Sequence, residues 1–295
     1  IKKTKFKLFK IILPILLLVF LYKYSYISLD PIKSIFYFGD FKIIFLITFL
    51  SFSCSFFLYL RFSYCLNIYR LKLNIFNLIE VNSQAYSFAS FVPGQIGIDA
   101  WRIGKLRKLD FTKFKTKLIN STILEKIMAI LSQIFILFFF IISNSFNRFL
   151  LILFTIIIIY LITFLSKEIG FKFNSIKKFA GTFNFRKISF LFLICVIANL
   201  ISCYLIKCIA ITFMMDYSLK VMSISSILSN IVGVIPISPN GLGISEFVFS
   251  EVTQNISNSN SNNAIATIYF CYRILNLFTH FLIYFSTKTI KIIKG

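Results

Sequence analysis

The sequence predicts an all-α polytopic membrane protein with about six transmembrane helices and two re-entrant helical hairpins, arranged as an inverted repeat. Hydrophobic residues make up 58% of the chain, and the mean hydropathy is +0.85. Several apolar runs reach the roughly 20 residues that a helix needs to cross a bilayer. The lysines and arginines gather in short segments between these runs, as the positive-inside rule describes.

The composition also limits the kinds of function. The net charge of +22 lies in connecting segments and not in a soluble basic module, so we expect no nucleic-acid partner. The six cysteines lie in or beside apolar runs without a Cys-x-x-Cys pair, which is typical of small buried hydrophobes. His280 is the only histidine, which excludes a multi-histidine zinc site. We therefore predict no metal and no cofactor.

The first half begins with a lysine-rich N-terminus, followed by an apolar run to Tyr22 that has no small-residue cleavage site. We expect an uncleaved first span with a cytoplasmic N-terminus. A second span over residues 41–60 returns to a basic segment that holds Arg61, Arg70 and Lys72. The next basic segment, residues 102–117, favours the same side of the membrane. The stretch between them, residues 75–101, should therefore enter the membrane and return as a re-entrant hairpin.

The remaining elements follow from the same charge argument. Two further spans are predicted over residues 118–142 and 149–165, and a fifth over residues 188–214. Residues 221–253 form the second hairpin, and residues 264–287 form the last span before a basic cytoplasmic tail. Each half contains two spans, a hairpin and one span. Three crossings are an odd number, so the second half starts on the opposite side of the membrane and is inverted relative to the first. We expect one integral membrane domain over residues 1–295, with halves of about 1–146 and 147–295.

A Pro-x-x-x-Gly-Ile pattern occurs in both predicted hairpins, starting at Pro93 and at Pro239. An acid follows each copy, Asp99 in the first and Glu246 in the second. Prolines and glycines interrupt a membrane helix, and a half-helix that begins there directs its N–H groups and its positive dipole end inward. Such an end can bind a phosphate or a carboxylate. The alternative is that Gly and Pro are simply frequent in membrane helices.

Ionisable residues also lie inside the predicted spans. Glu125 and Lys126 lie in the third span, and Arg273 lies in the last. Residues 269, 273, 276, 280 and 284 recur at helical spacing, and so do residues 121, 125 and 132. One interpretation is a polar pathway between these two stripes and the hairpin tips. The other is that Asp99, Glu125 and Glu246 only neutralise nearby cations and fix the packing of the helices.

Four motifs resemble the membrane domain of lysylphosphatidylglycerol synthases and their stand-alone relatives, the flippase-like domain family. The resemblance covers nearly the whole chain and implies movement of a lipid between leaflets. Three positions depart from the family pattern: Gln95, Lys126 and Ser245. The soluble aminoacyl-transferring domain is absent from this sequence, so synthase activity is not predicted. The motifs are residues 91–102 (FVPGQIGIDAWR), 124–126 (LEK), 236–246 (PISPNGLGISE) and 272–273 (YR).

The resulting hypothesis is a multi-pass lipid translocase of a bacterial or archaeal inner (plasma) membrane, with both termini in the cytoplasm. Its expected partner is a lipid with an anionic or polyprenyl-phosphate headgroup, with or without an aminoacyl group, and a homo-oligomer or a partner synthase is left open. The alternatives are a membrane subunit or transferase of lipid or glycolipid biosynthesis, and a small-solute transporter. The expected substrate-binding residues are Pro93, Gly94, Gly97, Asp99, Arg102, Glu125, Lys126, Pro239, Gly241, Gly243, Glu246, Arg273 and Asn276.

Overall fold

The structure is a computed structural model that describes residues 41–88, 96–108, 115–142, 152, 155–156, 185–234, 241–257 and 265–294. These ranges contain eight assigned helices and no strand, which confirms the helical membrane fold class. The predicted first span, and all but three residues of the predicted fourth, lie outside them. The helices are α3 (Phe41–Ile68), α4 (Ile75–Phe88), α5 (Ile96–Lys108), α6 (Lys115–Ile141), α9 (Phe185–Thr212), α10 (Leu219–Gly233), α11 (Ile244–Ser257) and α12 (Ile265–Lys294).

Four helices in the described part of the chain are long and apolar enough to cross a bilayer: α3, α6, α9 and α12. They coincide with the second, third, fifth and last spans that the sequence predicts. The difference lies at the end of α3, which continues to Ile68 and includes Arg61 as a buried helical residue. Arg61 does not belong to a basic connecting loop, because its charge is compensated inside the helix bundle by Glu125.

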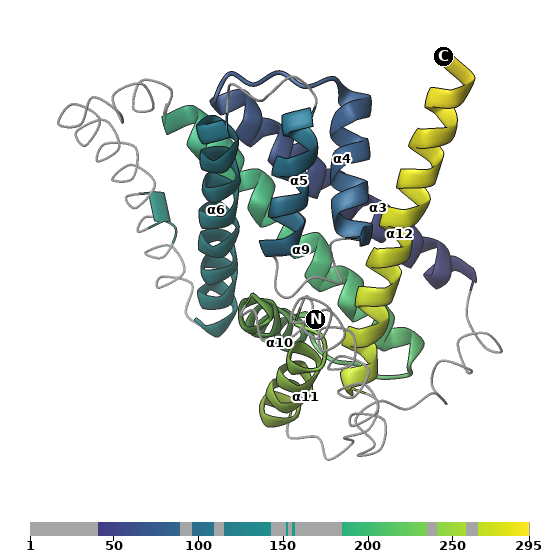
Figure 1. Cartoon of the computed structure of the whole chain (residues 1–295). Coiled ribbons are helices and arrows are strands. Elements are labelled where there is room, and N and C mark those ends of the chain that lie inside the picture. The colour runs from purple at the N-terminus through teal and green to yellow at the C-terminus, as the bar shows by residue number, and fades with distance from the viewer. Residues whose placement is uncertain are drawn as a thin grey trace, which may run out of the picture.

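The four shorter helices overlap the two stretches predicted as hairpins, residues 75–101 and 221–253. The structure extends both pairs, because α5 continues to Lys108, α10 begins at Leu219 and α11 continues to Ser257. Figure 1 shows α4 and α5 in the upper half of the view and α10 and α11 in the lower half, beside the long helix α6. The tips of both pairs, residues 89–95 and 235–240, lie outside the described residues. Re-entry into a membrane and the inverted repeat therefore stay predictions.

Two large apolar cores and smaller clusters hold the described helices together. One contains residues of α3, α4, α5, α6 and α9, with Phe62, Met128 and Leu191 fully buried. The other joins α9, α10, α11 and α12, with Leu205, Met222 and Phe249 at its centre. Helix α9 contributes to both cores and so connects the two halves of the described structure.

Large apolar side chains also cover the outside of the long helices. On α3, Phe45, Phe49, Phe52 and Phe56 are all exposed. Their spacing of three or four residues puts them on one face of the helix. An apolar face of this size is stable only where something other than water covers it, which agrees with a bilayer around the bundle.

Candidate functional site

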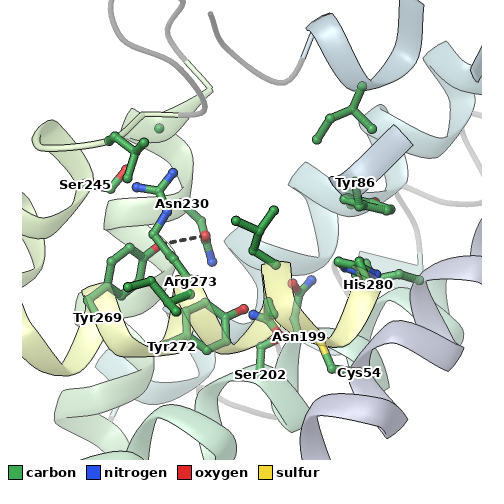
Figure 2. A pocket seen from close by; sticks show the side chains of 18 of the residues that line it. Cys54, Tyr86, Asn199, Ser202, Asn230, Ser245, Tyr269, Tyr272, Arg273 and His280 are labelled. Atoms are coloured by element: carbon green, nitrogen blue, oxygen red, sulfur yellow. Dashed lines mark hydrogen bonds between the residues drawn. The ribbon is translucent and has the colours of Figure 1, made fainter. Parts of the chain in front are cut away.

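A cavity of about 330 Å³ lies between the two halves of the described structure. Residues from every one of the eight assigned helices or their immediate ends line it, including Arg61, Lys126 and Arg273. Figure 2 shows Tyr86 and His280 on one side of the view and Tyr269, Asn230 and Arg273 on the other. The cavity therefore collects side chains from segments that are far apart in the sequence.

A cluster of five charged side chains borders one part of this cavity. Glu125 of α6 is fully buried and accepts hydrogen bonds from Arg61 Nε and Arg102 Nη1, each at 2.9 Å. Lys126 of the same helix lies 3.5 Å from Asp99 of α5. Arg102 also lies 3.7 Å from Asp99. The cluster links α3, α5 and α6, and it holds three cations against two carboxylates.

Arg102 has an unusual environment within this cluster. Its side chain is completely buried, and the guanidinium carbon lies 4.5 Å from the ring centre of Phe62 and 4.8 Å from that of Tyr86. Aromatic faces attract cations, so these rings stabilise its charge together with Glu125. Its Nε and Nη2 atoms have no hydrogen-bond partner among the described residues. The guanidinium is therefore fixed in position, and its Nε and Nη2 groups can still donate hydrogen bonds.

A second ion pair joins α11 to α12. Arg273 Nη1 donates to Glu246 Oε1 at 2.8 Å, and the Gly243 N–H donates to Glu246 Oε2 at 2.6 Å. Glu246 lies in the first turn of α11, where a carboxylate compensates the unpaired N–H groups and the helix dipole. The Gly243 N–H at the start of α11 is therefore already bonded to a carboxylate of the protein itself.

Gly241 and Gly243 shape the turn that precedes α11. Their φ angles are +77° and +88°, a region that residues with a side chain rarely adopt. A Cβ at Gly241 would lie 2.6 Å from Gly233 Cα, so the end of α10 approaches this turn very closely. Ser245 adds a hydrogen bond from its hydroxyl to the Ser229 carbonyl at 3.1 Å. These contacts fix the start of α11 against α10.

Aromatic side chains gather on the side of the cavity near α3 and α4. The Tyr59 hydroxyl lies 2.7 Å from His280 Nδ1, and the ring of Tyr86 stacks on His280 with centroids 4.6 Å apart. One turn earlier on α12, Asn276 Oδ1 accepts a hydrogen bond from Ser51 at 3.3 Å. These bonds attach α12 to α3 along the cavity wall.

The predicted site residues come together in part. Lys126, Arg273 and Asn276 line the cavity directly. Four more of the predicted residues do not line the cavity but form ion pairs with residues that do, or with each other: Asp99, Arg102, Glu125 and Glu246. Gly97 is buried in the first turn of α5. Pro93, Gly94 and Pro239 lie outside the described residues, so their placement stays a prediction.

Several lining residues were not predicted from the sequence. Arg61 was assigned to a loop, although Ser51, Cys54, Ser55 and Arg61 recur at helical spacing and form a polar face that the sequence already contains. The neutral polar residues of the cavity carry no such signal, because single amides and hydroxyls are common in membrane helices. They are Gln133, Asn199, Ser202 and Asn230.

In the described part of the chain, no group of three or more His, Cys, Asp or Glu side chains could hold a metal ion. The arrangement instead offers cations and neutral hydrogen-bonding groups around a partly open cavity. Such a site can bind an anion and orient it, with aromatic and aliphatic side chains as the remaining wall.

Comparison with known proteins gives one result that covers most of the chain. A family model described as the lysylphosphatidylglycerol synthase TM region matches residues 7–283. Neither the comparison with curated proteins nor the comparison with solved structures gave a match.

Proposed function

Because the chain belongs to the lysylphosphatidylglycerol synthase TM-region family, which points to a lipid-related role in a membrane, we propose that it moves a phosphate-bearing lipid between the leaflets of the inner (plasma) membrane. The observation that carries this proposal is the cavity, because both buried charge clusters supply cations to it. The phosphate of the headgroup binds there, and the acyl chains remain in the bilayer.

The charge balance supports an anionic ligand. Among the described residues, the ion pairs of Arg61, Arg102 and Lys126 involve Asp99 and Glu125, and these five groups together carry one excess positive charge when all are ionised. An uncompensated charge at membrane depth is costly, and a lipid phosphate would compensate it. At the other cluster Glu246 occupies the Gly243 amide, so we assign the phosphate contact to Arg273 rather than to the start of α11.

The position of the cations along their helices supports a site inside the bilayer. Lys126 lies eleven residues after the start of α6, about 16 Å along the helix axis. Arg273 lies eight residues after the start of α12, about 12 Å along the axis. A hydrocarbon core is about 30 Å thick, so both cations lie well within it if these helices span the membrane.

The size of the cavity supports a headgroup as its occupant. Ligand pockets in proteins usually measure about 300–1,000 Å³, and this cavity lies at the lower end of that range. It can enclose a headgroup but not a complete lipid with its acyl chains. The headgroup would therefore cross along the polar cavity while the chains follow through the bilayer.

The arrangement of the short helices supports alternating access. We propose that α4 with α5 and α10 with α11 are re-entrant hairpins that enter from opposite faces, as an inverted repeat requires. Movement of one hairpin against the other would open one side at a time. The expected substrate-binding residues at the hairpin tips and helix starts remain part of this proposal: Pro93, Gly94, Gly97, Pro239, Gly241 and Gly243.

The test is the rate at which fluorescent lipids change leaflet in proteoliposomes. Wild-type protein should accelerate one or more phosphate-bearing lipids, and Arg273→Ala should reduce that rate at least about tenfold because the phosphate loses its charged partner. Arg107→Ala, which removes an exposed arginine of α5 outside the cavity, should keep the wild-type rate. A wild-type rate in Arg273→Ala would overturn the site assignment.

Loss of the fold must be separated from loss of the site. Arg273→Ala leaves Glu246 as a buried carboxylate without its guanidinium, so the double variant Arg273→Ala with Glu246→Gln removes both charges together. The double variant should regain thermal stability in detergent and still fail to transport. If no phosphate-bearing lipid crosses faster with wild-type protein, with or without an ion gradient, the translocase proposal is wrong.

A further inference from the structure

The cavity wall contains neutral hydrogen-bonding groups among its apolar side chains. Four amide side chains line it, and each comes from a different helix: α6, α9, α10 and α12. Figure 2 shows Asn199 and Asn230 among the side chains that surround the open space. The amides are Gln133, Asn199, Asn230 and Asn276.

Each of these amides retains hydrogen-bonding capacity on the basis of the described contacts. Asn199 Nδ2 donates to Ser132, and Asn230 Oδ1 accepts from Tyr269, each at 2.8 Å. Asn276 Oδ1 accepts from Ser51. An amide has two donor hydrogens and an acceptor oxygen, so each of the three keeps its other end for a ligand. Gln133 makes no hydrogen bond to any other described residue, although it lines the cavity.

The same wall lacks negative charge. No Asp or Glu is among the described residues that line the cavity. Behind it, both oxygens of Glu125 and both oxygens of Glu246 accept hydrogen bonds. The third carboxylate, Asp99, has no hydrogen-bond partner at Oδ1 among the described residues, but it forms ion pairs with Arg102 at 3.7 Å and Lys126 at 3.5 Å. A ligand amine would therefore meet three lining cations and no lining carboxylate, which disfavours its charged form at this depth.

Resting on the function proposed above, we infer that the cavity selects a phosphate ester whose headgroup is neutral and rich in hydroxyls, and disfavours one that carries an amine. The cations bind the phosphate, and the amides bind the hydroxyls. A site built to hydrogen-bond a hydroxyl discriminates strongly against a ligand that lacks it, because the buried amides then stay unpaired. A glycerol or sugar phosphate fits this chemistry, and a lysyl ester of phosphatidylglycerol does not.

The experiment measures binding independently of transport, through the thermal unfolding midpoint in detergent. A ligand that binds the folded state raises this midpoint in proportion to the logarithm of its concentration over its Kd. The probes are dioctanoyl forms of phosphatidylglycerol, phosphatidylethanol and lysylphosphatidylglycerol. Phosphatidylglycerol should bind about tenfold more tightly than phosphatidylethanol, which keeps the phosphate and lacks the hydroxyls. Lysylphosphatidylglycerol should bind more weakly than phosphatidylglycerol.

Two nearly isosteric variants test whether the amide side chains of the cavity cause the preference for phosphatidylglycerol over phosphatidylethanol. Gln133→Met removes an amide that has no internal hydrogen bond in the described structure. Asn276→Leu leaves Ser51 its stronger partner, Thr279, at 2.7 Å. Both should bind phosphatidylglycerol about as weakly as phosphatidylethanol while phosphatidylethanol binding stays at the wild-type level. Equal binding of the first two lipids by wild-type protein, or tighter binding of the lysyl ester, would overturn the inference.

A soluble probe separates this inference from the proposed function. One outcome is that sn-glycerol 3-phosphate stabilises the protein as much as dioctanoyl phosphatidylglycerol does, and more than ethyl phosphate does. The inferred preference for hydroxyls is then correct, but the ligand is a soluble phosphate ester and not a lipid. If the lipid binds with the expected preference but no lipid changes leaflet faster in proteoliposomes, the inference stands and the translocase proposal fails.

Discussion

At the scale of single residues, Glu125 is the carboxylate that two buried arginines share. It is fully buried and accepts from two guanidinium groups that are themselves almost inaccessible. A buried ion pair contributes little net stability, because desolvation offsets the attraction between the charges. Removing one partner is different, since the remaining charge then stays buried without compensation. The charge compensation of Arg61 and Arg102 therefore depends chiefly on this carboxylate.

We predict that Glu125→Gln lowers the free energy of unfolding by about 3–5 kcal/mol, because Arg61 and Arg102 lose their shared counter-charge while the side-chain shape is kept. Thermal unfolding in detergent measures the effect as a fall in the midpoint. Glu80→Gln is the matched control, since Glu80 pairs with Lys291 at the protein surface and its loss should change stability by less than about 1 kcal/mol. Equal shifts in the two variants would contradict the central role of Glu125.

The charged residues differ in how far the sequence could reveal them. Glu125, Lys126 and Arg273 stand inside apolar runs, where any ionisable group is conspicuous. Arg61 stands at the edge of a basic segment, where charge counting assigns it to a loop. Which cation meets which carboxylate depends on the rotation of each helix about its axis, and a single sequence does not determine that rotation. The ion pairs therefore had to come from the structure.

At the scale of helices, the contact between α10 and α11 depends on two glycines, which have no side chain to keep the backbones apart. The C-terminal end of α10 and the turn before α11 approach so closely that Gly233 and Gly241 meet backbone to backbone. Small residues permit such approach between helices in membranes, where packing and hydrogen bonds replace the hydrophobic effect. Buried serines of α10 continue the contact, with Thr253 of α11 donating to Ser225 at 2.9 Å. The two helices are thus closely packed where α10 ends and α11 begins.

We predict that Gly241→Ala destabilises the protein by at least about 1–3 kcal/mol, because φ is +77° there and the new Cβ would lie 2.6 Å from Gly233 Cα. Gly104→Ala is the matched control. Gly104 lies within helix α5, and a Cβ added there would meet nothing within 4 Å, so alanine should stabilise the helix by up to about 1 kcal/mol. Thermal unfolding should show shifts of opposite sign, and a shift of the same sign in both variants would contradict this packing argument.

The sequence predicted helices better than helix ends. Residues 41–60, 118–142 and 188–214 were expected as spans, and α3, α6 and α9 occupy them. Hydrophobic runs reveal a span because the bilayer requires them, whereas the end of a helix depends on local contacts. The chain after Leu60 stays helical because Glu125 compensates Arg61 and because Phe62, Cys65 and Leu66 pack into the core.

At the scale of the whole molecule, the two pairs of short helices allow a test of which side of the membrane each pair faces. Arg107 near the end of α5 and Asn255 near the end of α11 are both exposed. In Figure 1 the α4 and α5 pair lies near the end of the molecule that holds the C-terminus, and the α10 and α11 pair lies toward the other end. From the positive-inside rule we expect the C-terminal end to lie in the cytoplasm.

We predict that a cysteine at Asn255 reacts with a membrane-impermeant maleimide in intact spheroplasts, whereas a cysteine at Arg107 reacts only after permeabilisation. The physical reason is that the two hairpins enter from opposite faces if the halves are inverted, so the ends of α5 and α11 lie in different compartments. The wild-type chain gives the background, since five of its six cysteines are buried and Cys271 is half-buried. Labelling of both positions from the same side would contradict the inverted repeat, and with it the alternating access on which the proposed transport depends.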